Sequence, residues 1–326
     1  MRPQFGNDSA GLTAGLTIEF VCPSCKERLL KQTDDWICEA EALRFSVRDG
    51  IPDFILPHRR SAVEEFLTVY NTVRTKEKWG SNQAEYYRLL PFQDITGIHR
   101  SIWRIRSKTF RSFSRDLSAS IPDASLILDI GAGNGWLSNR LAEEGHGVIA
   151  LDINLSDLDG LGAAKFFLSK STLPFLPVRA EFDHLPFCDP VFDAVIFNAS
   201  VHYSGDPVRT IRNTLRLVKE NGALYIMDSP IFHNAAEGNR MLEDKVIEIG
   251  SKAGRRVSMD NIGSFLNPAH LNDLESQCVI EYIDPNYGMR LRIRRTLARV
   301  LRRRELASFG IIKVLKKHLA ETALPG

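Results

Sequence analysis

Three glycines and two acids between residues 129 and 152 are the residues of this chain best suited to chemistry. The glycines are Gly131, Gly133 and Gly135, and Asp152 follows the first of them after 21 residues. Glycines allow the sharp turn and the close ligand approach that a nucleotide-like cofactor requires. A carboxylate at the tip of the next strand can accept both hydroxyls of a ribose. The spacing therefore predicts a nucleotide-like cofactor bound at this loop.

Two details of the loop argue against a dinucleotide. A dinucleotide loop reads G-x-G-x-x-G, whereas Trp136 stands at the third glycine position here. Asp129 precedes the loop, and a carboxylate there would repel a pyrophosphate at a helix N-terminus. The same carboxylate suits a cofactor that carries an ammonium and a sulfonium but no phosphate. S-adenosylmethionine (SAM) has this chemistry, so the residues favour SAM.

The flanking residues predict the elements that hold the loop. Leu126 to Leu128 form a short apolar run, and Val148 to Leu151 form another, as expected for buried parallel strands. The segment between them, Ser138 to Glu144, reads as a helix with glycines after it. The order strand, glycine loop, helix, strand predicts an α/β fold.

The motif LDIGAGNG (128–135) resembles the first motif of class I SAM-dependent methyltransferases, and the resemblance extends over residues 98–318. It implies a Rossmann-like sheet of seven strands, mostly parallel, with the last strand antiparallel. Aligned on the turn Leu185-Pro186-Phe187, the resemblance implies that Glu181 reads the adenine amino group, with Asp183 as the near alternative. Together the loop and the resemblance predict these cofactor-binding residues: Asp129, Gly131, Ala132, Gly133, Asn134, Gly135, Asp152, Ile153, Glu181, Phe182, Asp183 and Asn198.

Candidates for the acceptor side follow the fourth and fifth strands of this expected sheet. His202 is the first choice for a base or substrate contact, since a neutral imidazole suits pH 7. The alternative is a structural histidine that hydrogen-bonds within its loop. Tyr203, Asp228 and His233 are further candidates for catalysis. A hydroxyl or carbon acceptor needs such a base, because a proton must leave it.

A second unit is expected near the N-terminus. Cys22, Cys25 and Cys38 have the spacing of a zinc ribbon, but Glu41 stands where the fourth cysteine belongs. The segment 17–57 resembles the zinc-ribbon-like domain found beside several methyltransferases. Either these four residues hold zinc as a Cys3Glu site, or a degenerate ribbon folds without metal around three buried thiols.

The remaining boundaries follow from composition and periodicity. We expect a disordered N-terminus at 1–16, the ribbon at 17–57, a helical linker at 58–97 and the methyltransferase domain at 98–326. Helices are expected at 62–73, 98–117, 234–249 and 269–277, and late strands at 222–228, 279–283 and 308–315.

A basic insertion lies between the last two expected strands. Residues 290–326 hold 11 Lys and Arg against 2 Asp and Glu, so this segment carries +9 and the rest of the chain −7. Residues 289–306 predict a basic amphipathic helix at the ligand-binding edge of the sheet. The helix could cap the domain, attract an anionic substrate or a membrane surface, or bind RNA phosphates.

Composition limits the wider setting. No run is long and apolar enough to span a membrane, no signal peptide is visible, and five cysteines argue against a disulfide framework, so a cytoplasmic protein is expected. The predicted function is SAM-dependent methyl transfer to a small-molecule or lipid-like acceptor, at oxygen. The alternatives are an rRNA or tRNA base methyltransferase, for which the ribbon would grip RNA, and a SAM-binding regulatory protein without turnover.

Overall fold

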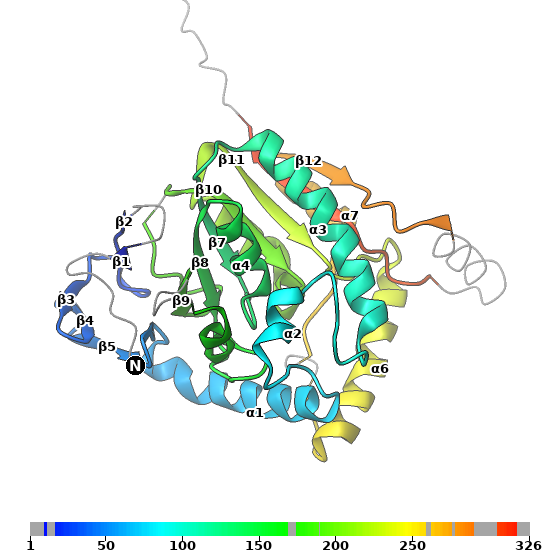
Figure 1. Cartoon of the computed structure of the whole chain (residues 1–326), viewed down its shortest axis with the longest axis horizontal. Helices are drawn as coiled ribbons and strands as arrows, with labels where there is room; N and C mark the ends of the chain where they lie inside the picture. Colours follow the sequence, from blue (N-terminus) through cyan, green and yellow to red (C-terminus); the bar gives the residue numbers. More distant parts are fainter. Residues whose placement is uncertain are drawn as a thin grey trace, which may run out of the picture.

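The computed structural model describes residues 10–11, 17–168, 174–188, 190–258, 262–275, 278–289 and 305–317. Its centre is a seven-stranded sheet in the order β12-β13-β11-β10-β7-β8-β9 (Figure 1). The strands are β7 (Leu126–Ile130), β8 (Gly147–Asp152), β9 (Leu176–Arg179), β10 (Phe192–Asn198), β11 (Val218–Met227), β12 (Cys278–Ile283) and β13 (Ile311–Lys316). Strands β7 to β11 pair in parallel, and β13 pairs antiparallel with both of its neighbours. The predicted Rossmann-like α/β fold is confirmed.

The central strands are apolar along their whole length because both faces of the sheet are covered. All residues of β7 are buried, Asp129 included. Helices α3 (Arg100–Ser120) and α4 (Trp136–Glu143) cover one face, with Phe113 and Leu137 in the core that they share with the sheet. Helices α5 (Pro207–Leu215) and α7 (Pro268–Leu271) cover the other face.

A third group of helices lies at the ends of the parallel strands. Helix α1 (Arg60–Lys76) runs past the carboxyl ends of β8 and β9, and α6 (Ala235–Ala253) packs beside it (Figure 1). The Asn71 amide donates to Asn154 Oδ1 over 3.3 Å, which joins α1 to the loop that follows β8. The remaining short helices are α2 (Ala84–Leu89), η1 (Pro57–Arg59), η2 (Leu161–Phe167), η3 (Val201–Tyr203) and η5 (Asn272–Leu274).

The N-terminal unit is a small antiparallel ribbon in the strand order β3-β4-β5-β6. Its strands are β3 (Leu30–Gln32), β4 (Asp35–Cys38), β5 (Leu43–Arg48) and β6 (Ile51–Pro52). Two isolated β-bridges join this unit to the part of the protein that holds the central sheet. Phe20 pairs with Phe187, and Asp53 pairs with Arg179. Phe20 and Trp36 belong to the same buried cluster as the central strands, so the ribbon and the sheet share one core.

Several expected elements shift by a few residues at their ends. Helix α4 begins at Trp136 rather than Ser138, and α1 extends the expected helix 62–73 by two residues before it and three after. The expected helix 269–277 is instead the short α7 followed by η5. Of the expected disordered segment 1–16, the structure describes Ala10 and Gly11 alone, as strand β1 paired with β2 (Thr17–Ile18). Most of the expected basic helix, residues 290–304, lies outside the described residues.

Candidate cofactor-binding site

The glycine loop after β7 adopts a backbone that side chains rarely allow. Gly131 has a φ of +73°, and a Cβ on it would lie 2.3 Å from the Cβ of Ser200. Gly135 has a φ of +78°, and its Cβ would lie 2.7 Å from Phe175. Both positions therefore require glycine for conformation and for space. The loop holds a tight turn at the carboxyl edge of the sheet, where ligands bind in open α/β folds.

Asp152 lies at the tip of β8 and is already held by the loop. One carboxylate oxygen accepts from the backbone N–H of Gly133 over 2.8 Å, and the other accepts from that of Asn154 over 2.8 Å. Burial raises the pKa of this carboxyl to about 6, despite these two hydrogen bonds. Asp152 can thus accept further hydrogen bonds from a ligand that enters beside it.

A cavity of about 330 Å³ joins the predicted cofactor residues. Of the predicted set it is lined by Gly131, Gly133, Asp152, Ile153, Glu181, Phe182, Asp183 and Tyr203. The opposite wall comes from α1, through Val63, Phe66, Leu67 and Tyr70. Sequence reasoning missed this wall and treated α1 as part of a linker. Its signal was present, because apolar residues at 63, 66, 67 and 70 follow helical spacing.

The two acids predicted to read adenine, Glu181 and Asp183, both line this cavity. Glu181 accepts from Arg59 Nη2 over 2.9 Å and from Arg59 Nε over 3.2 Å, so the two side chains form a forked ion pair. Asp183 lies 3.7 Å from a guanidinium nitrogen of Arg209. The ring of Phe182 packs edge-on against Phe197. Arg59 was not predicted, since it lies 122 residues before its partner.

Two further predicted residues carry buried oxygens without a partner. Asp129 is fully buried, and Ser138 donates to one of its oxygens over 2.7 Å. The other oxygen of Asp129 and the side-chain oxygen of Asn198 have no hydrogen-bond partner among the described residues. Burial raises the pKa of Asp129 to about 7. Unsatisfied buried acceptors are costly, so they fit a ligand that brings donors such as an ammonium. Asp129 and Asn198 do not line the cavity, nor do Ala132, Asn134 and Gly135 of the glycine loop.

The candidates after β10 differ in their access to the cavity. Tyr203 lines it, with its ring 5.9 Å from that of Tyr70 and 6.1 Å from that of Phe66. His202 is buried behind it, with Nδ1 3.1 Å from the Ser229 hydroxyl. Burial lowers the pKa of His202 to about 3, so its ring is neutral. This environment is that of a structural histidine.

The two catalytic candidates that follow β11, Asp228 and His233, lie in different surroundings. Asp228 directly follows the strand with a φ of +50°, and it accepts from the Thr109 hydroxyl over 2.9 Å. Burial raises the pKa of the Asp228 carboxyl above its ordinary value. His233 is exposed, and its backbone N–H donates to Glu305 over 3.1 Å. Neither Asp228 nor His233 lines the cavity.

The three ribbon cysteines converge on one point. Their sulfur atoms all lie within 4.8 Å of one another, and Sγ of Cys25 is 3.5 Å from that of Cys38. Tetrahedral zinc with bonds of about 2.3 Å places its sulfur ligands about 3.8 Å apart, so the cluster fits that ion. Glu41 Oε2 lies 3.7 Å from Cys22 Sγ, while its other oxygen accepts from Ser24 over 2.9 Å.

The central part of the chain is similar to known proteins. Residues 128–226 match the family model described as a methyltransferase domain. This part of the chain is a methyltransferase domain. The matched residues run from β7 through β11, so the methyltransferase domain includes the glycine loop, Asp152, Glu181 and the η3 turn.

The individual relatives of this chain differ in what their names say they act on. The glycine/sarcosine/dimethylglycine N-methyltransferase of Actinopolyspora halophila is 26% identical over 258 residues, which cover 76% of this chain and 43% of the relative. The ubiquinone/menaquinone biosynthesis C-methyltransferase UbiE of Vibrio cholerae is 30% identical over 169 residues, covering 49% and 61%. The YcgJ protein of Bacillus subtilis has a TM-score of 0.45 and 16% identity, covering 64% of this chain and 99% of that structure. The chain spans about half the length of the curated relatives it matches.

Proposed function

We propose that the protein transfers the methyl group of SAM to a small-molecule acceptor. The observation that carries the proposal is a single cavity lined by the glycine loop, Asp152, Glu181 and Tyr203. In this proposal Asp152 binds the ribose, Glu181 and Phe182 bind the adenine, and Asp129 and Asn198 face the methionine end. SAM brings a methyl group already activated by its sulfonium, so the protein mainly orients the acceptor and excludes water.

The small-molecule acceptor is supported by the relatives. Their names specify glycine derivatives and quinones, which are small acceptors methylated at nitrogen and carbon. The aromatic rings of Phe66, Tyr70 and Tyr203 give the cavity an apolar end suited to such a molecule. No helix in the described part of the chain is long and apolar enough to cross a membrane.

The oxygen acceptor predicted from the sequence stays a prediction, and it requires a base. His202 is poorly suited, because its lowered pKa makes it a weak proton acceptor. Asp228 is the better candidate, since burial raises the pKa of its carboxyl above the ordinary value and makes the carboxylate a stronger proton acceptor. Tyr203, which lines the cavity, is assigned as a contact of the acceptor, and Asp228, which lies outside the lining, is the candidate for the base.

We further propose that Cys22, Cys25 and Cys38 hold a zinc ion, with Glu41 as the fourth ligand. The support is the convergence of three thiols and the position of the Glu41 carboxylate beside one of them. Zinc here would hold the ribbon together and would take no part in methyl transfer.

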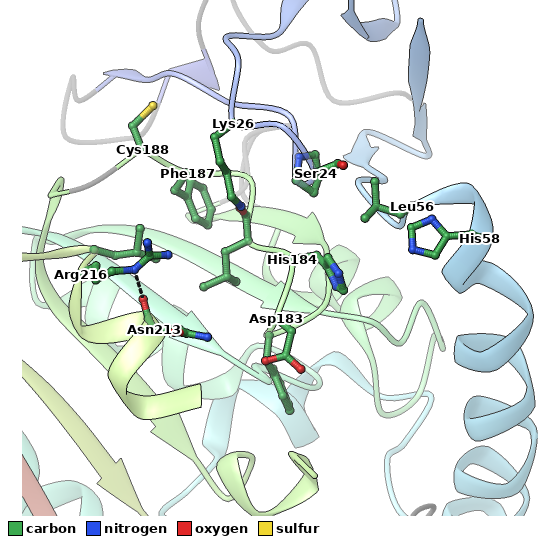
Figure 2. A pocket seen from close by; sticks show the side chains of 14 residues that line it. Ser24, Lys26, Leu56, His58, Asp183, His184, Phe187, Cys188, Asn213 and Arg216 are labelled. Atoms are coloured by element: carbon green, nitrogen blue, oxygen red, sulfur yellow. Dashed lines mark hydrogen bonds between the residues drawn. The ribbon is translucent and has the colours of Figure 1, made fainter. Parts of the chain in front are cut away.

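One feature favours RNA as a second candidate acceptor. A groove of about 640 Å³ runs between the ribbon and the loop after β9, and Figure 2 shows Lys26 and Arg216 on its opposite sides. Lys26 Nζ donates to the Leu185 carbonyl over 2.9 Å. The lining contains these two cations and one carboxylate, Asp183, so it carries one net positive charge, the sign that attracts a phosphate.

A transfer assay tests these alternatives together. Purified protein is incubated with methyl-labelled SAM and separate metabolite, lipid and RNA fractions. We expect label in the metabolite or lipid fraction and none in RNA. Salt-sensitive labelling of RNA would support the second candidate instead. SAM binding without transfer to any fraction would contradict the proposed methyltransferase activity. It would support the alternative of a SAM-binding regulatory protein without turnover.

A further inference from the structure

We infer that the N-terminal ribbon helps to position the SAM-binding residues. It does so through Asp53 and Arg59, which lie on the segment that leaves the ribbon. The inference rests on the proposed SAM binding and assigns a role to residues outside the methyltransferase motifs. Both residues lie between β6 and α1, so this segment connects the ribbon directly to the cavity wall.

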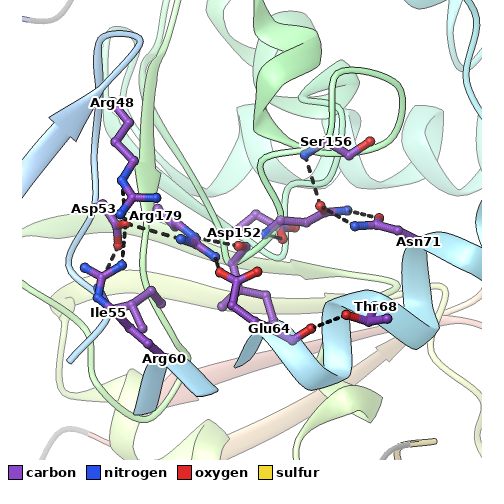
Figure 3. Close-up of polar contacts among 12 residues, drawn as sticks. Arg48, Asp53, Ile55, Arg60, Glu64, Thr68, Asn71, Asp152, Ser156 and Arg179 are labelled. Carbon is purple, nitrogen blue, oxygen red and sulfur yellow. Dashed lines mark hydrogen bonds and ion pairs between the residues drawn. The ribbon is translucent and has the colours of Figure 1, made fainter. Parts of the chain in front are cut away.

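Arg179 is the centre of the first connection. It is buried at the end of β9, and its guanidinium makes three contacts in three directions (Figure 3). Its Nε donates to the Ile153 carbonyl over 2.8 Å, directly after Asp152. Its two Nη atoms reach Asp53 over 3.2 Å and Glu64 of α1 over 2.6 Å. The Arg179 side chain thus connects the segment that leaves the ribbon, and helix α1 of the cavity wall, to the end of β8. Asp152, the acid proposed to bind the ribose, lies at that end.

Asp53 holds this guanidinium in place. Its carboxylate is fully buried and also accepts from Arg60 over 2.9 Å and from the backbone N–H of Ile55 over 3.1 Å. In the ribbon, Arg48 Nε lies 3.6 Å from Asp53 Oδ2, the oxygen that Arg60 and Arg179 also contact (Figure 3). A buried carboxylate among several guanidinium groups compensates charges that would otherwise be unpaired. Without this carboxylate, Arg179 keeps Glu64 but loses its buried partner, one of the two carboxylates that fix its direction toward Ile153.

Arg59 makes the second connection, at the adenine end. Its fork on Glu181 fixes the plane of that carboxylate, and both side chains line the cavity. Each carboxylate oxygen can accept more than one hydrogen bond, so Glu181 keeps capacity for an amino group of a ligand. Arg59 therefore orients the residue proposed to distinguish adenine from other bases.

The experiment compares full-length variants by titration calorimetry with S-adenosylhomocysteine and with S-inosylhomocysteine, whose base lacks the amino group. The variants are Asp53→Asn, Arg59→Gln and Arg59→Lys. Glu19→Gln is the matched control, because Glu19 belongs to an exposed ion pair with Arg28 in the ribbon. Thermal unfolding of each ligand-free variant is measured alongside.

Asp53→Asn is expected to raise the Kd for both ligands about 10-fold, as for a moderate coupling between sites. Arg59→Gln is expected to raise the Kd for the adenosyl compound about 10-fold and to narrow its preference over the inosyl compound, with partial rescue by Arg59→Lys. The control should match the wild type. A lower unfolding temperature with unchanged Kd values and unchanged base preference would overturn the inference. If Asp53→Asn does not fold, Arg59→Gln decides, since its side chain is 41% exposed. A wild-type protein that binds neither ligand would instead refute the proposed function.

Discussion

At the scale of single residues, Asp228 combines three features of a functional side chain. It follows β11 at the carboxyl edge of the sheet, its φ of +50° is unusual for a residue other than glycine, and burial raises its pKa. Strained backbone persists where the surrounding structure holds it, and such positions cluster at functional sites. The Thr109 hydroxyl fixes the carboxylate from α3.

Asp228→Asn should therefore lower kcat by about 10²- to 10⁴-fold, the usual contribution of a general base, while the Kd for SAM stays unchanged. Steady-state kinetics with the identified acceptor and calorimetry with SAM measure the two quantities. His233→Asn is the control, because His233 is exposed and lies away from the cavity. Equal turnover by Asp228→Asn and the wild type would show that Asp228 is not the base.

The raised pKa values of Asp129 and Asp152 predict a pH-dependent affinity. In the proposed site both carboxylates act as acceptors, so SAM binds the ionised forms better. The affinity should fall as pH is lowered through about 7 for Asp129 and about 6 for Asp152. Calorimetry between pH 8 and 5 measures this, and Asp152→Asn should flatten the lower part of the curve. Affinity that does not change over this range would contradict the assignment.

The same two groups affect the ligand-free fold with the opposite sign. Their folded pKa values lie above the ordinary value of 3.8, so the folded state holds protons that the unfolded state releases. Their contribution to the free energy of unfolding is greatest below pH 4 and is lost as pH rises toward 7. At neutral pH the burial of these two ionised carboxylates therefore destabilises the ligand-free fold. In the proposed site, hydrogen bonds from bound SAM offset this cost.

The residues that the sequence could predict are those whose contacts are local. The glycine loop and Asp152 lie within one strand-loop-helix-strand unit, where spacing alone places them together. Arg59 and Glu181 are 122 residues apart, and no local pattern indicates that they pair. His202 has the right type and position in the sequence, but burial behind Tyr203 depends on packing that the sequence does not display.

At the scale of elements, the ribbon depends on a small number of contacts around its cysteines. Four short strands bury Trp36 and Phe45, and a unit of this size commonly needs a metal or disulfide for stability. The three thiols supply the metal site in our proposal.

Elemental analysis of purified protein should accordingly give one zinc per chain, and removal of zinc with a chelator should lower the unfolding temperature. Cys38→Ser should lose the metal, because Cys38 contributes one of the three converging sulfur atoms. Cys188→Ser is the control, since Cys188 is exposed and belongs to no such cluster among the described residues. Protein that contains no zinc and tolerates the chelator would indicate the degenerate, metal-free ribbon.

At the scale of the whole molecule, the ribbon and the sheet form one core. Composition and motifs predict two units, and the order of elements follows that prediction, but the buried cluster is continuous from Phe20 and Trp36 to Phe187 and Phe192. Two units that share apolar surface gain stability from one another. This shared surface could not be predicted, because each unit reads as complete in the sequence.

The full chain should consequently unfold in one transition. Circular dichroism follows the central sheet and helices, and tryptophan fluorescence includes Trp36 of the ribbon. Coincident curves from the two probes are the expected outcome for one cooperative unit. An early fluorescence transition with intact helical signal would show that the chain does not unfold as one unit.

The central claim is that SAM binds in the cavity beside Asp152, and titration calorimetry of the full-length protein with SAM tests it most directly. We predict one site per chain, and an affinity that Asp152→Ala weakens by about 1–3 kcal/mol, the range for loss of a charged hydrogen-bond acceptor. Asp157→Ala serves as the control, since Asp157 is an exposed acid in the loop after Asp152. Absence of binding by the wild type, or equal affinity in Asp152→Ala, would contradict the account.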